Sequence, residues 1–194
     1  MDADPLTPEL LLYGYQSGLF PMAEGAEGPL YWYAPDPRAI LPLEAFHTPK
    51  NVRKLVRRAV FEVRTNTAFE AVMRACADRP ETWISEEIIA AYTALHQQGW
   101  AHSVECWQDG TLVGGLYGVA LGGAFFGESM FHRVRDASKV ALWHLVHRLR
   151  AGGFVLLDTQ YTTDHLARFG VIEIPRPVYQ LRLAQALTVQ GQWA

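Results

Sequence analysis

The sequence is poor in cysteine, and its two cysteines, Cys76 and Cys106, lie far apart without forming a CxxC pair. That spacing argues against a zinc knuckle or a disulfide framework and favours reduced thiols. No apolar run reaches the roughly 18 residues that a membrane-spanning helix needs. The start, MDADPLTPEL, has neither the basic nor the apolar segment of a secretory signal. We therefore expect a cytoplasmic protein without a membrane partner.

Strong net charge and phosphate-binding loops are missing as well. The net charge is −3, so any contact with nucleic acid requires a local basic patch. The glycines of GGLYGVALGG fit neither a dinucleotide-binding nor a Walker pattern, and no Q/R-x-x-G-x-G/A loop is present to hold the pyrophosphate of coenzyme A. His144 and His147 share a predicted helix face without an evident third ligand, so no metal site is predicted.

What is present is an ordinary globular composition, 49% hydrophobic and 19% charged. Residues 1–37 are rich in glycine and proline, and we predict that they form a small N-terminal lobe with a helix over 8–16 and a strand over 30–33. Residues 38–194 are predicted to form the larger domain.

The larger domain is predicted to begin with helices and then to change to strands. A capping box from Thr67 to Glu70 predicts the start of one of these helices. Residues 102–131 alternate and turn as an antiparallel meander does. A helix over 137–151, a short buried strand over 154–160 and two further helices follow. This order favours an α+β fold over a regular βαβ array.

A basic face marks the helix predicted over residues 50–58. Its cations follow helical spacing at i, i+3, i+4, i+7 and i+8, namely Lys50, Arg53, Lys54, Arg57 and Arg58. The apolar residues of the helix point the opposite way. Such a face suits a phosphate backbone. A solvated helix face is the alternative, although solvated helices usually mix charges of both signs.

Glu128 stands inside an apolar strand, between Phe125-Phe126 and Met130-Phe131. Burying a carboxylate costs free energy unless the carboxylate has a partner. Either the side chain points outward to water, or it binds a cation that is not part of this chain. In the second case the cation is a substrate ammonium group, and Met130 lines an apolar pocket beside it.

Asp158 and Gln160 end the short buried strand. The C-terminal ends of strands commonly carry binding sites, and residues two apart point to the same face of a strand. A carboxylate beside an amide can orient an amine nucleophile and accept its proton. The alternative is that Asp158 only terminates the strand.

Several motifs together resemble one enzyme family, leucyl/phenylalanyl-tRNA–protein transferase. In order along the chain they are YQSGLFP (15–21), PDPRAI (35–40), TWI (82–84), AHSVECW (101–107), LVGGLYGVA (112–120), GESMF (127–131), ASK (137–139), LLDTQ (156–160) and EIPR (173–176). The resemblance covers almost the whole chain from about residue 10 to 180. GESMF, ASK and EIPR in this order are jointly very specific.

The resemblance implies a small N-terminal lobe followed by a domain like the GNAT acetyltransferases. It also implies the transfer of leucine, phenylalanine or sometimes methionine from aminoacyl-tRNA to the N-terminal Arg or Lys of a protein, which then enters N-degron proteolysis. An aminoacyl ester is already activated, so no ATP, metal or organic cofactor is needed.

Individual residues take roles from the resemblance. Glu128 matches the glutamate that holds the α-amino group of the donor, and Asp158 and Gln160 match the catalytic pair. Trp83 matches an aromatic residue near the aminoacyl–adenosine end. The basic face matches a cluster that contacts tRNA phosphates. The residues that match the side-chain pocket are Met130, Leu116, Leu145 and Leu149.

The chain also departs from the family pattern. Met22 stands where the family has a Trp that stacks on the terminal adenine of the tRNA, and the neighbouring Tyr15, Trp32 and Tyr33 are candidates to replace it. Thr163 stands where an Asn is expected. Two rival functions are an acyl-CoA-dependent N-acetyltransferase and a tRNA-binding module without catalytic activity.

Overall fold

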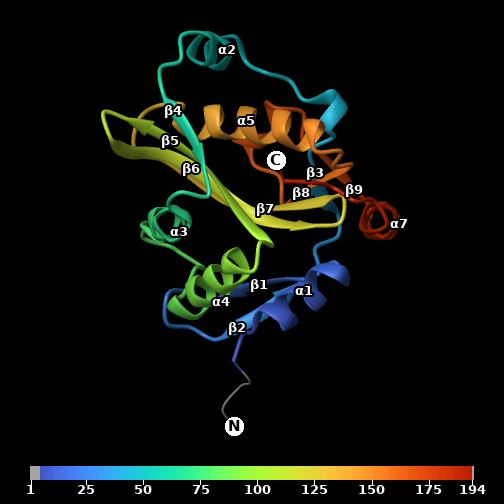
Figure 1. The fold of residues 1–194 in the computed structure, drawn as a ribbon. Helices are drawn as coiled ribbons and strands as arrows, with labels where there is room; N and C mark the ends of the chain where they lie inside the picture. The colour runs from blue at the N-terminus through green and yellow to red at the C-terminus, as the bar shows by residue number, and fades with distance from the viewer. Residues whose placement is uncertain (1–4, 194) are drawn as a thin grey trace.

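A seven-stranded sheet lies at the centre of the computed structural model, which describes residues 5–193 (Figure 1). Its strand order is β4-β5-β6-β7-β8-β3-β9. Neighbouring strands are antiparallel except β7 and β8, which are parallel. The strands are β3 (Arg38–Ile40), β4 (Glu62–Thr65), β5 (Ala101–Gln108), β6 (Thr111–Leu121), β7 (Ala124–His132), β8 (Leu156–Gln160) and β9 (Ile172–Ile174).

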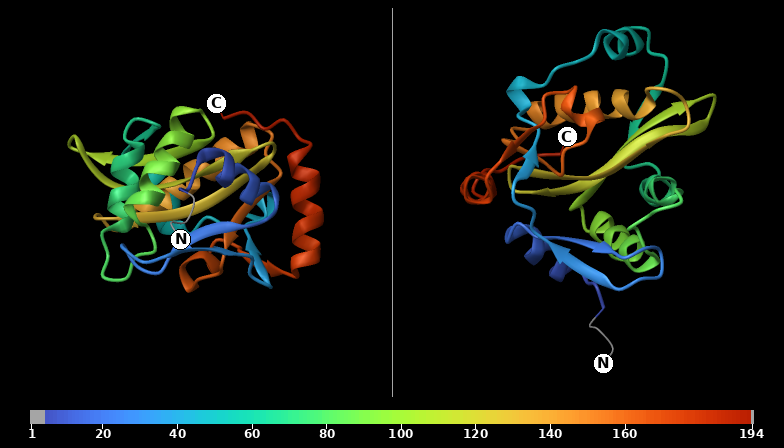
Figure 2. Two further views of the ribbon diagram at one scale, coloured as in Figure 1. Left: turned by 90° about the horizontal axis from the view of Figure 1, so that it is seen from below. Right: turned by 180° about the vertical axis from the view of Figure 1, so that it is seen from behind.

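Helices cover both faces of this sheet and bury a separate apolar core on each (Figures 1 and 2). The helix α5 (Ala137–Ala151) packs on one face, with α2 (Lys50–Arg57) beyond it. The opposite face is covered by α3 (Phe69–Ala77) and α4 (Glu86–Gln97). The helix α7 (Arg176–Leu187) lies beside β7 and β8.

The N-terminal segment packs against α4. It consists of α1 (Pro8–Gln16) and a hairpin of β1 (Phe20–Ala23) and β2 (Leu30–Tyr33). Thr7 caps α1 as its sequence indicates, because its side chain accepts a hydrogen bond from the backbone N–H of Leu10. This small two-stranded unit is separate from the main sheet.

The predicted α+β class is confirmed, and so is the meander, whose first turn has left-handed backbone at Asp109 and Gly110. The predicted capping box of α3 is wrong. No side chain within the helix caps it. The backbone N–H groups of Thr67 and Ala68 instead donate to the buried carboxylate of Glu105 on β5, at 2.9 Å each.

The remaining elements are short. They are the 3-10 turn η1 (Leu43–Ala45) and the helix α6 (Asp164–Ala167), which Thr163 caps through its hydroxyl group. Within residues 5–193, no helix is long and apolar enough to cross a membrane.

Candidate functional site

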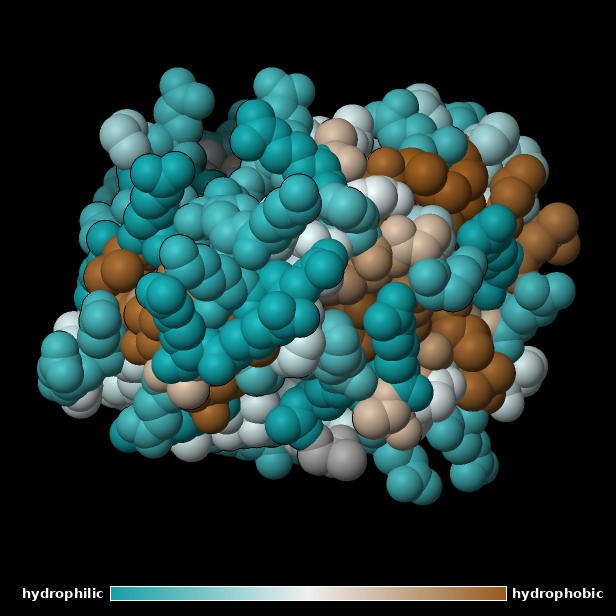
Figure 3. Space-filling model, turned by 90° about the horizontal axis from the view of Figure 1, so that it is seen from above, coloured by the Kyte–Doolittle hydropathy of each residue, from teal (hydrophilic) through white to brown (hydrophobic). Residues whose placement is uncertain are grey.

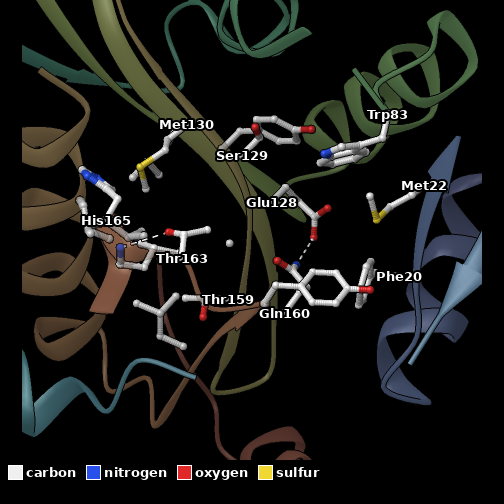
Figure 4. A pocket seen from close by; sticks show the side chains of 18 of the residues that line it. Phe20, Met22, Trp83, Glu128, Ser129, Met130, Thr159, Gln160, Thr163 and His165 are labelled. Carbon is white, nitrogen blue, oxygen red and sulfur yellow. Dashed lines mark hydrogen bonds between the residues drawn. The ribbon is translucent and has the colours of Figure 1, made fainter. Parts of the chain in front are cut away.

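A pocket of about 260 Å³ opens where β7 and β8 separate (Figure 4). The β7–β8 pairing runs from Ala124 and Leu156 to Phe126 and Asp158 and then stops. Glu128 and Gln160 face each other in the middle of the pocket. Met130 and His165 lie toward one end, and Met22 and Trp83 lie toward the other.

The strands are irregular at both central residues of the pocket, Glu128 and Gln160. Between β6 and β7 the register passes from Tyr117 opposite Ser129 to Gly118 opposite Gly127, so Glu128 is the extra residue of a β-bulge. Gln160 ends β8 with φ of +57°, a left-handed conformation that non-glycine residues rarely adopt. Glu128 lies on the same face of the sheet as Phe126, since both contact Tyr15.

Glu128 is surrounded by hydrogen-bond donors. Its Oε1 accepts from the Tyr15 hydroxyl at 2.7 Å and from Nε2 of Gln160 at 3.0 Å. The Tyr92 hydroxyl lies 3.4 Å from Oε2 and donates to the Tyr15 hydroxyl, whose own proton is used for Glu128. Burial raises the pKa of Glu128 to about 8, although the Tyr15 hydrogen bond opposes this rise. The carboxylate therefore lies in the pocket and does not alternate outward to bulk water.

Asp158 lies behind this pocket and is completely buried. Its Oδ1 accepts from Arg38 Nε at 3.0 Å and from the Gln160 backbone N–H at 2.8 Å. Its Oδ2 accepts from Arg38 Nη2 at 2.7 Å and from the Tyr179 hydroxyl at 2.6 Å. All four lone-pair directions of the carboxylate are thus used. The expectation that Asp158 itself meets an attacking amine therefore finds no open acceptor position, whereas Gln160 lines the pocket.

The apolar end of the pocket contains most of the residues expected there. Leu116, Met130 and Leu145 line it, but Leu149 does not. Leu149 lies further along α5 and is completely buried in the core on that face of the sheet, so its assignment to the pocket is wrong. Leu142, which was not predicted, lines the pocket as well. Helical spacing could have found it, because it precedes Leu145 by one turn.

Sequence reasoning also missed polar atoms in the pocket wall. Tyr117, Thr159 and His165 line the pocket, and each has a buried side-chain atom without a hydrogen-bond partner among the described residues. These atoms are the Tyr117 hydroxyl, Thr159 Oγ1 and His165 Nε2. No periodic pattern in the sequence marks them, because they come from separate elements.

The aromatic end of the pocket is built by the N-terminal hairpin and the loop before α4. Phe20, Met22 and Trp83 line it. Tyr15 does not reach a surface where tRNA could bind, because its side chain is completely buried and donates to Glu128. The expectation that Tyr15 contacts tRNA is therefore wrong. Trp32 packs against Gly14, where an added Cβ would lie 2.1 Å from its ring.

The basic face is exposed to solvent. Its members are all exposed: Lys50, Arg53, Lys54 and Arg57 on α2, and Arg58 at its C-cap. Asn51 fixes α2 to the loop before α5, because its Nδ2 donates to Asp136 Oδ2 at 2.9 Å. The surface on this side of the molecule is mostly hydrophilic, with apolar patches toward its two ends (Figure 3).

Within residues 5–193, no group of three or more His, Cys, Asp or Glu residues is placed to hold a metal ion.

Comparison with known proteins gives the family. The leucyl/phenylalanyl-tRNA protein transferase family matches residues 40–184, and the N-terminal domain of the same family matches residues 4–36. The chain belongs to this family. A leucyl/phenylalanyl-tRNA–protein transferase from Salinibacter ruber is 60% identical over 98% of this chain and 84% of its own length. One from Gloeobacter violaceus is 61% identical over 95% of each chain.

Among solved structures, the chain is similar to a ribosomal-protein-alanine N-acetyltransferase from Brucella melitensis. The sequences are 15% identical, the TM-score is 0.40, and the match covers 69% of this chain and 95% of the acetyltransferase. The α+β class rests on the strands and helices of the transferase-family chain itself.

Proposed function

We propose that this protein transfers leucine, phenylalanine or methionine from aminoacyl-tRNA to the N-terminal Arg or Lys of other proteins, marking them for N-degron proteolysis. Family membership supports the reaction class. The single structural observation that supports it best is the placement of Glu128 in an apolar pocket, opposite the Gln160 amide.

In this proposal the donor amino acid occupies the pocket with its ammonium group at Glu128. The hydrogen-bond partners of Glu128, Tyr15 and Gln160, are uncharged, and an ammonium ion would supply a positive charge beside the carboxylate and lower its pKa. The donor side chain then extends toward Met130, Leu116, Leu142 and Leu145. Unbranched or γ-branched side chains fit such flexible walls better than β-branched ones.

The acceptor amine reacts at the carbonyl carbon of the donor ester. A peptide bond forms, the ester bond to the tRNA ribose breaks, and the ribose oxygen leaves with a proton. Gln160 orients the amine, and Asp158 acts through Gln160 by holding its backbone N–H. Positioning of this kind can supply up to roughly 7–11 kcal/mol of the barrier. The donor ester is already activated, and the reaction has no need of a metal or an organic cofactor.

The tRNA lies along the exposed basic face of Lys50, Arg53, Lys54, Arg57 and Arg58. Phosphate contacts of this type are independent of base sequence. Its terminal adenosine sits at the aromatic end of the pocket, beside Trp83 and Met22. We further propose that residues 1–37 and 38–194 are two domains, and that the protein acts in the cytoplasm, where charged tRNA is available.

Single-turnover transfer tests the proposal. Radiolabelled Leu-tRNA is mixed with excess protein and with peptides that differ only in an N-terminal Arg, Lys or Ala. Transfer to the Arg and Lys peptides and not to the Ala peptide is the expected result. Transfer from an acyl-CoA thioester in place of the charged tRNA would instead identify an N-acetyltransferase. Binding of charged tRNA without any transfer would identify a non-catalytic binding module.

A further inference from the structure

Arg38 is a buried cation next to the proposed site, and the reaction described above gives it no part. Only 1% of its surface is exposed, although it carries a charge. Its Nε and Nη2 donate to the two oxygens of Asp158, and its Nη1 donates to the backbone carbonyl of Gly18 at 3.0 Å. All of its charged nitrogens therefore have protein acceptors.

Two aromatic rings also contact the Arg38 guanidinium. The group lies 4.7 Å from the centre of the Phe20 ring and 4.5 Å from the centre of the Tyr179 ring. Phe20 lines the pocket, and the Tyr179 hydroxyl donates to Asp158. Arg38 consequently contacts the pocket by two routes, through the Phe20 ring and through Asp158 to the Gln160 backbone.

Stability alone is a weak reason for such an ion pair. Removing two charges from water is costly, and apolar residues of similar volume often replace a buried pair without loss of stability. A bidentate Arg–carboxylate pair does fix geometry, because two parallel hydrogen bonds allow the carboxylate only one rotation. Lys has the charge but lacks the planar fork, so it cannot fix the carboxylate in this way.

We infer that Arg38 is a positioning residue for aminoacyl transfer, and this inference rests on the proposed function. Arg38 fixes the rotation of Asp158, and Asp158 in turn holds the left-handed backbone of Gln160. The Gln160 amide is thereby directed at Glu128 and the pocket. Arg38 also places the Phe20 ring in the pocket wall, so the N-terminal hairpin and the end of β8 keep a fixed geometry.

The test compares Arg38→Lys and Tyr179→Phe with the wild-type protein in the transfer assay. A misplacement of about 1 Å at a reacting group costs on the order of 100-fold in rate, so kcat of Arg38→Lys should fall by that factor. Tyr179→Phe removes one of the four donors to Asp158 and should lower kcat about fivefold to tenfold. Because neither residue lines the pocket, the affinity for charged tRNA should change less than threefold in both variants.

The matched control is Arg64→Lys, which alters an exposed Arg–carboxylate pair with Glu62 on β4 and should leave kcat and affinity unchanged. Near-UV circular dichroism shows which variants are folded. If Arg38→Lys does not fold, the inference is tested with Tyr179→Phe alone. A folded Arg38→Lys with kcat within twofold of wild type, or a wild-type rate for Tyr179→Phe, overturns the inference. Absence of transfer by the wild-type protein instead overturns the proposed function.

Discussion

Replacing Glu128 by Gln removes one charge and keeps the shape of the side chain. In the wild-type protein the carboxylate accepts hydrogen bonds from Tyr15 and Gln160. A glutamine carbonyl can still accept from both, but it offers no charge to a substrate ammonium group. A hydrogen bond to a charged group contributes about 1.5–3 kcal/mol, so the ionised wild-type form should bind charged tRNA about 10-fold to 150-fold more tightly than Glu128→Gln. More donor should then partly restore the transfer rate.

The pH dependence of donor binding should also differ between the wild-type protein and Glu128→Gln. Burial raises the pKa of Glu128 to about 8, so the free protein carries a proton there at pH 6 and 7. An incoming ammonium group must displace this proton. Wild-type donor affinity should therefore rise up to about tenfold per pH unit between pH 6 and 8, as long as the donor amine stays protonated. The affinity of Glu128→Gln should stay nearly constant over this range.

Because Glu128 is protonated in the folded protein, we also expect the stabilities of the wild-type protein and Glu128→Gln to depend differently on pH. The pKa of Glu128 is higher in the folded protein than the unfolded value of 4.5. The folded state therefore binds more protons than the unfolded state between pH 4.5 and about 8, and its stability falls as pH rises through this window. The loss is up to about 1.4 kcal/mol per pH unit. Glu128→Gln lacks this loss, so its stability relative to wild type should increase with pH.

Two measurements test whether Glu128 holds a proton in the free protein. Equilibrium binding of non-hydrolysable aminoacyl-adenosine gives the donor affinity at several pH values, and urea unfolding gives the stability at the same values. Parallel pH profiles for wild type and Glu128→Gln in both experiments would refute the argument. They would mean that the Glu128 carboxylate is already ionised in the free protein and that burial does not hold a proton there.

Three further predictions concern the tRNA and the donor. Replacing Arg53 and Arg57 by Ala should raise KM for several different charged tRNAs alike and reduce the salt slope by about one per lost phosphate contact; an unchanged slope would remove α2 from the interface. Met22→Trp should tighten binding of an aminoacyl-adenosine analogue by ~1–3 kcal/mol through base stacking, measured by titration calorimetry, whereas weaker binding would show that Phe20 or Trp83 already fills the space. Leu-tRNA should react faster than Ile-tRNA, by a factor that corresponds to ~1–3 kcal/mol, because the apolar end of the pocket has flexible walls; equal single-turnover rates would contradict this.

The long elements of the fold could be predicted from the sequence because each carries a local signal. Thr7 before Pro8 marked the start of α1, and Asp109-Gly110 marked the turn of the meander. The strands β3 and β9 were missed, since three residues are too few to show alternation. The capping box failed for a different reason. Glu105 is distant in sequence, and its carboxylate took the donors that Glu70 was expected to satisfy.

Only some members of the candidate site could be predicted, and its geometry could not. Glu128 and Gln160 do meet, but the bulge at Glu128 and the positive φ of Gln160 are not visible in the sequence. The surroundings of Asp158 were not visible in the sequence, since its partners come from β3 and α7. Arg38 lies in the PDPRAI motif, yet no spacing rule connects it to Asp158.

The β-bulge at Glu128 limits which insertions and deletions the sequence can accept. Glu128 stands in the pocket as the one residue of β7 that has no partner on β6 at that point. Deleting Glu128 would make Gly127 and Ser129 consecutive opposite Gly118 and Tyr117, which restores an unbroken ladder. Met130 would stay opposite Leu116, but the pocket would lose its carboxylate. A mutation that makes the sheet more regular would therefore disable the site without unfolding the protein. Insertions and deletions should be far rarer between Gly127 and Met130 than at the hairpin turns, even where single substitutions are accepted.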